Sequence, residues 1–238
     1  MKILISGGRG NLATEIIKAN KEHEILSLPK EELNVCSKNE ILSWLRIFKP
    51  DIFIHTAALT RPMIKHVTRP DVSIETNIIG TSNVVLACMK HNVKLIYIST
   101  DYIYPCTDGN YSEEDALLPV NEYAWSKLGG ECAVKLYENS LILRMALCQQ
   151  PFPHPKALVD IKKSYLYMDE AAKVILKLIN ETGVINVGGD AMTPYEFVSK
   201  DNPGIEEITF NEINDITMGK DSSMNISKMK NILNDTTI

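Results

Sequence analysis

The chain has 238 residues, 45% of them hydrophobic and 23% charged, which is ordinary for a globular protein that buries one sizeable core. Its formal net charge of -5 leaves no basic stripe, so we exclude nucleic acid as a partner. Five cysteines without a C-x-x-C pair indicate reduced thiols rather than a disulfide framework. With no signal peptide and no apolar run of membrane-spanning length, the sequence predicts a cytoplasmic protein without a membrane partner.

The N-terminus combines a strand, a glycine-rich turn and a helix. The apolar run Lys2–Ser6 predicts a buried strand, and the glycine-rich turn follows it directly. Gly7 can form the tight turn, Gly10 lets the backbone approach a pyrophosphate, and Ala13 is small enough for the helix to pack on the strand. The exposed N–H groups of the helix start can then bind phosphate. This context predicts a dinucleotide site whose further contacts are Arg9, Asn11 and Leu12.

The second predicted strand, Glu24–Leu28, bears on the choice of cofactor. NAD-binding proteins usually place an acid after this strand, where it binds the ribose 2′-hydroxyl. Here Lys30 comes first and the nearest acid is Glu31. Lys30 and Arg9 can instead bind a 2′-phosphate, so we prefer NADP to NAD; solvated surface cations are the alternative. The predicted cofactor site is completed in this region by Asn34 and Val35.

Strands and helices alternate through the first 147 residues. Helices are predicted at residues 39–48, 70–90 and 123–138, and strands at residues 52–56, 93–99 and 141–144. This alternation predicts an α/β fold with a doubly wound parallel sheet of the Rossmann type. Ligands bind at the carboxyl ends of such strands, where the third strand offers the cofactor Thr56, Ala57 and Ala58. Asn77, in the long helix, is a candidate for bonding the backbone near the cofactor.

Tyr123 and Lys127 lie four residues apart, which places them one turn apart on one face of a helix. A free tyrosine has a pKa of about 10 and exchanges protons poorly at neutral pH. A fixed ammonium group nearby favours the phenolate and lowers that pKa, which suits general acid–base catalysis. Thr100, at the end of the fourth strand, offers a hydroxyl to the same substrate oxygen. On spacing alone, an amphipathic helix with a buried tyrosine and a solvated lysine is the alternative.

The pattern changes beyond residue 147. Three prolines between residues 149 and 156 favour extended or turn structure, and Thr193 with Pro194 predicts a helix start. A helix at residues 168–179 and a strand at residues 184–187 are expected to return to the main sheet. Residues 205–210 and 226–233 are expected to form a small α+β cap. We therefore predict a dinucleotide-binding domain at residues 1–147, joined by residues 168–190, and a small substrate-binding part at residues 148–238.

These motifs resemble the extended short-chain dehydrogenase/reductase family, and within it the sugar-nucleotide reductases of the dTDP-4-dehydrorhamnose reductase type. The resemblance rests on residues 7–13, 55–60, 77–83, 99–104, 109–115, 123–127 and 130–131. It implies that Tyr123 is the catalytic acid–base, that Lys127 binds the nicotinamide ribose, and that Thr100 shares the substrate oxygen. It further implies a nicotinamide cofactor, the 4-keto group of a nucleoside-diphosphate 6-deoxyhexose as substrate, and a homodimer formed through the helices near residues 76–90 and 121–138. Substrate contacts are expected from Thr60, Asp101 and Tyr102.

Several alternatives to a reductase stay open at this point. The 4,6-dehydratases of this family carry Asp-Glu after the threonine, whereas Asp101 is followed here by Tyr102, which argues against dehydration. A sugar-nucleotide epimerase needs little beyond the tyrosine and the lysine. The reductases usually carry an aromatic residue where this chain has Met145-Ala146-Leu147, and their substrate region is longer. That departure also fits a non-catalytic dinucleotide-binding regulatory subunit. Because the histidines lack ligand spacing, we expect no metal site.

Overall fold

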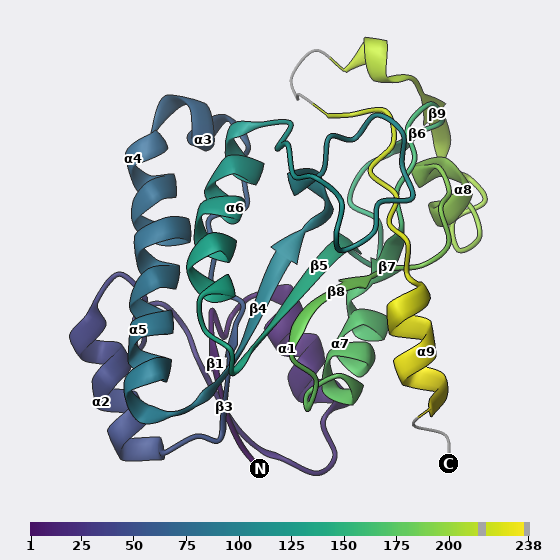
Figure 1. The fold of residues 1–238 in the computed structure, drawn as a ribbon. Helices are drawn as coiled ribbons and strands as arrows, with labels where there is room; N and C mark the ends of the chain where they lie inside the picture. Colours follow the sequence, from purple (N-terminus) through teal and green to yellow (C-terminus); the bar gives the residue numbers. More distant parts are fainter. Residues whose placement is uncertain (214–217, 236–238) are drawn as a thin grey trace.

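In the computed structural model, which describes residues 1–213 and 218–235, helices cover both faces of a central sheet (Figure 1). The strands of this sheet are β1 (Lys2–Ser6), β2 (Glu24–Leu28), β3 (Ile52–His55), β4 (Lys94–Thr100), β5 (Ser140–Cys148), β7 (Tyr165–Tyr167) and β8 (Gly183–Val187). Their order is β2-β1-β3-β4-β5-β7, with β8 also paired to β5, and all of these ladders are parallel. The predicted α/β fold with a doubly wound parallel sheet is thereby confirmed.

The first strand shows why the central strands are continuously apolar. Ile3, Leu4 and Ile5 are each completely buried. Ile3 and Ile5 belong to the core on one face of the sheet, and Leu4 belongs to the core on the other face. Side chains alternate between the two faces of a strand, so a sheet covered on both sides needs apolar residues at every position.

Two layers of helices enclose the sheet. One face packs against α1 (Asn11–Ala19), α7 (Met168–Lys177) and α9 (Ser227–Asp235). The other packs against α2 (Lys38–Phe48), α5 (Thr81–His91) and α6 (Glu122–Lys135). In Figure 1, α2, α5 and α6 lie to the left of the sheet and α1, α7 and α9 to its right. The predicted helices at residues 39–48, 70–90 and 168–179 are confirmed within a few residues at their ends.

The long helix at residues 70–91 is assembled from α4 (Pro70–Ser73), the π-helical segment Ile74–Gly80 and α5, and the short α3 (Ile64–Thr68) precedes it. By length and composition alone this Pro70–His91 helix could cross a membrane, so the expectation that no apolar run is that long was wrong. Its α5 portion packs against α2, α6 and β4, as a core helix does. Its apolar composition therefore has a structural explanation within the fold.

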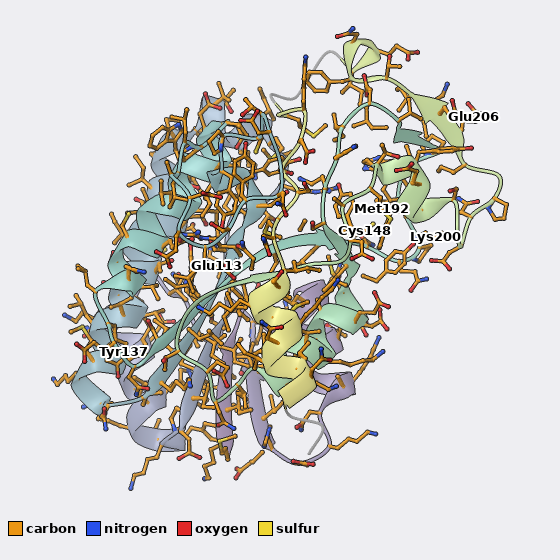
Figure 2. The ribbon with its side chains drawn as sticks, turned by 45° about the vertical axis from the view of Figure 1, so that its right-hand side comes forward. Glu113, Tyr137, Cys148, Met192, Lys200 and Glu206 are labelled. Carbon is orange, nitrogen blue, oxygen red and sulfur yellow. The ribbon has the colours of Figure 1, made fainter. Side chains whose placement is uncertain are left out.

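Residues 148–213 and 218–235 divide between the main sheet and a smaller part. β6 (Lys156–Leu158) pairs in parallel with β9 (Glu206–Ile208), and α8 (Pro194–Val198) packs beside them. Figure 2 shows Met192, Lys200 and Glu206 on this small part, with Cys148 near its junction with the main sheet. The short 3₁₀ turns Asp101–Ile103 and Phe210–Glu212 complete the described elements.

Two expectations about this region were wrong. β5 extends to Cys148 rather than ending at residue 144, because its first half pairs with β8 and its last three residues pair with β7. The helix at residues 226–233 does not belong to a cap. As α9 it packs on β8, and Ile226 and Met229 are buried in the same core as α1 and α7. The cap is therefore limited to β6, β9, α8 and the loops between them.

Candidate active site

A cavity of about 1080 Å³ lies along the carboxyl ends of the parallel strands. Its wall is contributed by the glycine turn after β1, the loops after β2 and β3, the end of β4, α6 and the cap. This is where open α/β sheets bind their ligands, at the point where the strand order reverses between β1 and β3. Of the residues predicted for cofactor, catalysis and substrate, all except Asn77 line this cavity.

The glycine turn forms a close cradle at one end of the cavity. Gly7 has a positive φ of 76°, and a Cβ there would lie 2.9 Å from the Ala57 backbone. Helix α1 then starts after Gly10, which provides no side-chain cap, and its first turn contains no acidic residue. The amide groups of this helix start can therefore bind an anion, and the partial positive charge of the helix end favours one. The residues present fit the pyrophosphate of a dinucleotide.

Arg9, Lys30 and Glu31 line the cavity beside this cradle. The guanidinium of Arg9 lies 3.3 Å from a carboxylate oxygen of Glu31, and both side chains are mostly exposed. Exposed ion pairs of this kind are weak, so Arg9 can exchange Glu31 for a ligand phosphate. Glu31, the nearest acid after β2, lines the same cavity, where its carboxylate can accept from a ribose hydroxyl; the sequence analysis assigned it no role. Both NADP and NAD are compatible with this end of the cavity.

Asn77 is the predicted site residue that does not reach the cavity. Its side-chain amide donates to the Leu59 carbonyl at 2.9 Å and to Ser126 Oγ at 2.8 Å, while its oxygen accepts from the Leu59 N–H at 2.8 Å. The buried amide thus clamps the loop after β3 to helix α6. Asn77 therefore bonds backbone, as expected. It was also predicted to bind the cofactor directly, but its side chain does not line the cavity. His55, on β3, is buried and bonds the Ser6 and Thr81 side chains.

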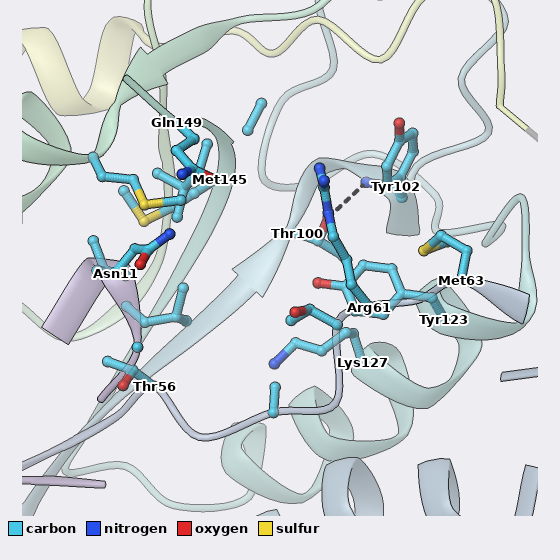
Figure 3. Close-up of a pocket in the computed structure, with 18 of the residues that line it drawn as sticks. Asn11, Thr56, Arg61, Met63, Thr100, Tyr102, Tyr123, Lys127, Met145 and Gln149 are labelled. Carbon is cyan, nitrogen blue, oxygen red and sulfur yellow. Dashed lines mark hydrogen bonds between the residues drawn. The ribbon is translucent and has the colours of Figure 1, made fainter. Parts of the chain in front are cut away.

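Thr100, Tyr123 and Lys127 point into the same region of the cavity (Figure 3). Thr100 ends β4, whereas Tyr123 and Lys127 occupy successive turns of α6. The Asn121 side chain caps this helix by accepting from the Ala124 N–H at 2.9 Å. The ammonium of Lys127 lies 4.1 Å from the centre of the Tyr97 ring, whose hydroxyl donates to the Lys127 carbonyl. The predicted trio therefore converges through secondary-structure elements that are held rigidly.

The electrostatics of the trio differ from the sequence-based expectation. Burial raises the pKa of Tyr123 above its ordinary value, the charge of Asp101 raises it further, and a hydrogen bond with Thr100 lowers it. Burial also lowers the pKa of Lys127 to about 7, with Glu131 acting in the opposite direction. The expectation that Lys127 brings the tyrosine pKa down toward neutrality was wrong for the protein alone, because burial disfavours both charged forms. A protonated Tyr123 is the form that can donate a proton.

A buried ion pair joins the elements that carry Thr100, Tyr123 and Lys127. Arg144, on β5, lies 2.7 Å from the Glu131 carboxylate of α6, and both side chains are about 95% enclosed. The Ser99 hydroxyl donates to the other oxygen of Glu131, and Arg144 also donates to the Tyr104 hydroxyl at 2.8 Å. These contacts join β4, β5 and α6 directly behind Thr100 and Tyr123.

The cavity includes functional candidates that the sequence analysis missed. Arg61, from the loop after β3, and Lys163, from the stretch before β7, both line it. Lys163 pairs with Asp101, so that Asp101 reaches the cavity already bound to another residue of the chain. A Lys-Lys pair at residues 162–163 has no local signal that would distinguish a buried lysine from a solvated one. Only the fold brings Lys163 to the end of β4.

The fold and this site define a dinucleotide-binding protein of the short-chain dehydrogenase/reductase class. The family model described as the RmlD substrate binding domain matches residues 1–151, and the chain belongs to that family. This match covers the dinucleotide cradle, Thr100 and the α6 pair.

Individual relatives agree with the family. A dTDP-4-dehydrorhamnose reductase from Aggregatibacter actinomycetemcomitans is 30% identical over 152 residues, which cover 60% of this chain and 50% of the relative. The methionine adenosyltransferase 2 subunit beta of Pongo abelii is 32% identical over 149 residues, covering 59% and 44%. This chain thus spans about half the length of these curated relatives. The crystal structure of a Bacillus anthracis dTDP-4-dehydrorhamnose reductase in complex with NADP superposes with a TM-score of 0.86 at 23% identity, covering 98% of this chain and 91% of that one.

Proposed function

We propose that this protein is an NAD(P)H-dependent reductase of a nucleoside-diphosphate 4-keto-6-deoxy sugar. The observation that carries the proposal is the convergence of Thr100, Tyr123 and Lys127 at a cavity with a dinucleotide cradle. A non-catalytic protein has no chemical need for all three side chains. Family membership and relatives named dTDP-4-dehydrorhamnose reductase support the same assignment.

The chemistry divides between cofactor and protein. When bound, the reduced dinucleotide supplies the hydride for the carbonyl carbon. Tyr123 transfers its phenolic proton to the carbonyl oxygen as that oxygen gains negative charge, and Thr100 donates a hydrogen bond to the same oxygen. Lys127 binds the ribose hydroxyls beside the nicotinamide. Because burial raises the pKa of Tyr123, the phenol remains protonated at neutral pH and ready for reduction.

The test mixes the protein with NADPH and dTDP- or GDP-4-keto-6-deoxyhexose and follows the nicotinamide absorbance. We expect the absorbance to fall with turnover, and Tyr123→Phe to reduce kcat about 100- to 10,000-fold, the usual contribution of a positioned acid. Tyr137→Phe is the matched control, because its hydroxyl donates to the Val93 carbonyl at 3.0 Å and does not line the cavity. If Tyr123→Phe turned over as fast as the wild type, the assigned mechanism would be wrong.

For the cofactor we propose a preference for NADP. Arg9 and Lys30 at the cradle support it, as does the relative crystallised with NADP. Comparing the dissociation constants of NADPH and NADH by nicotinamide fluorescence tests the preference. Tighter binding of NADH would indicate that Glu31 binds the ribose hydroxyl, and it would overturn the preference for NADP.

A second candidate is a dinucleotide-binding subunit without turnover. The relatives named methionine adenosyltransferase 2 subunit beta and the short substrate region favour it. Tight binding of NADPH, with no consumption across a panel of sugar nucleotides, would support this candidate over the reductase.

For the assembly we propose a homodimer through the exposed faces of α5, the segment before it, and α6. Large apolar side chains are exposed there: Ile79 is 48% exposed, Leu86 50%, Trp125 55%, and Leu136, at the C-terminal end of α6, 81%. α6 packs against α5 and against the segment Ile74–Gly80, so these exposed side chains belong to neighbouring elements. Exposed apolar surface of this kind typically marks an interface, and a two-fold dimer would bury it against its own copy.

A further inference from the structure

A second buried ion pair lies at the catalytic end of the cavity. The Lys163 ammonium is 2.5 Å from Asp101 Oδ2, and both side chains are only 3% exposed. The same ammonium lies 3.6 Å from the centre of the Tyr102 ring and donates to Ser222 Oγ at 3.2 Å. Asp101 directly follows Thr100 in the chain. The pair therefore sits one residue from a catalytic hydroxyl.

The two oxygens of Asp101 have different partners. Lys163 and the Ser222 hydroxyl both donate to Oδ2, the latter at 2.6 Å. Oδ1 accepts from the Thr100 hydroxyl at 3.1 Å. Two strong donors thus hold the carboxylate from the side that faces away from Thr100, and they come from parts of the chain more than 50 residues away.

Thr100 has a single hydroxyl proton, and this limits what it can do. While the proton is donated to Asp101, it is not available to a substrate oxygen. Transfer of this hydrogen bond to a substrate leaves Asp101 without one of its donors. A buried carboxylate without sufficient donors is strongly disfavoured, so the transfer is feasible only because Lys163 and Ser222 still satisfy Asp101.

Charge imposes the same requirement. Carbonyl reduction places negative charge on the substrate oxygen beside Thr100 and Tyr123, and an unneutralised carboxylate next to them would oppose it. Burial is the main cause of the raised pKa of Tyr123, Asp101 adds to it, and Lys163 acts against it. Buried ion pairs are in general a poor source of stability, because desolvation offsets their attraction. Electrostatic balance at the site is the better explanation of this pair.

We propose that Lys163 is a positioning residue of the active site, which holds Asp101 at Oδ2, frees the Thr100 hydroxyl for the substrate oxygen and neutralises the carboxylate beside Tyr123. This proposal rests on the reductase function proposed above. Lys163 donates no proton and acts only through Asp101 and Thr100.

The experiment compares Lys163→Met with the charge-balanced double variant Lys163→Met/Asp101→Asn, using NADPH and the sugar nucleotide that the wild type reduces. We expect Lys163→Met to lower kcat at least 100-fold while the KM for the sugar nucleotide and the dissociation constant of NADPH stay within threefold. The kcat of the double variant should be at least tenfold higher than that of Lys163→Met, because no unpaired buried carboxylate remains. Lys162→Met is the matched control: Lys162 is exposed, and this variant should behave as the wild type.

The possible outcomes separate a failure of the reductase function from a failure of the role proposed for Lys163. If the wild type shows no turnover, the reductase function fails and Lys163 loses its role with it. If the wild type turns over and Lys163→Met keeps its kcat, only the proposal for Lys163 is refuted. Should Lys163→Met not fold, the double variant, which buries no unpaired charge, is the test. An inactive double variant that binds NADPH normally would show that Lys163 acts directly and would overturn the positioning role.

Discussion

Lys127 is enclosed beside the Tyr97 ring, and burial lowers the pKa of its ammonium group to about 7. In the unfolded chain a lysine has a pKa of about 10.4. Between these values the unfolded chain binds a proton that the folded protein lacks, so the contribution of Lys127 to the free energy of unfolding rises with pH. Without added cofactor, the wild type should therefore gain stability relative to Lys127→Met from pH 7 to pH 10, by at most about 1.4 kcal/mol per pH unit.

Urea unfolding at four pH values in this window measures that difference. Lys135→Met is the control, since Lys135 is exposed on the same helix. A difference between wild type and Lys127→Met that is constant across the window would contradict the lowered pKa.

The residues that the sequence made predictable are those whose chemistry is local. The spacing of Tyr123 and Lys127 and the order of the glycine turn depend only on helix and turn geometry. The pairing of Asp101 with Lys163 spans 62 positions, so only the fold brings it together. Asn77 bonds the Leu59 backbone, as expected, but it does not line the cavity. Residue type indicates a hydrogen-bonding side chain but not the direction in which it points.

At the scale of the element, α6 depends on its first turn. Asn121 caps it through Ala124, and Tyr123 lies within that turn. Asn121→Ala should lower the free energy of unfolding by about 1 kcal/mol, because it leaves an N–H group of the helix start without its acceptor. It should also lower kcat more than it raises KM, since a frayed first turn misplaces the phenol. Asn121→Asp, which keeps a capping oxygen, should preserve both, and urea unfolding with steady-state kinetics measures them. Equal stability of Asn121→Ala and the wild type would contradict a stabilising cap.

Strands could be predicted from the sequence where a run of apolar residues marks them. Strands β1, β3 and β4 each contain a run of consecutive apolar residues, because helices cover both faces of the sheet. β6 and β7 are only three residues long, and β6 follows a proline-rich stretch, so neither has a periodicity to detect. Their pairing depends on partners that are distant in the chain.

At the scale of the molecule, the partition between sheet and cap was predicted only in outline. The cleft between β1 and β3 follows from strand order, which alternation of strands and helices indicates in advance. The position of α9 could not be predicted in this way. The pattern of an amphipathic helix shows that one of its faces is buried, but not which part of the protein that face packs against. Ile226 and Met229 are buried in the core beside α1 and α7, not in a cap.

The proposed dimer makes a prediction about the whole molecule. Trp125, on α6, is 55% exposed, and Leu136, which directly follows the last residue of α6 with helical backbone angles, is 81% exposed. They are eleven residues apart and therefore on one face. Around a two-fold axis each would lie near its own copy or near α5 of the partner, so a glutamate at both positions would place like charges together in a desolvated interface. Light scattering after size-exclusion chromatography should give twice the chain mass of 26.7 kDa for the wild type and a single chain mass for Trp125→Glu/Leu136→Glu.

Leu118→Glu is the matched control for that measurement. Leu118 is 59% exposed but lies on the loop between β4 and α6 rather than on the helices. This variant should remain dimeric, because the added charge stays in water. A wild type with the mass of one chain would refute the dimer. A double variant that stays dimeric would move the interface to another face, whereas dissociation of Leu118→Glu would extend it to the loop that leads into the catalytic helix.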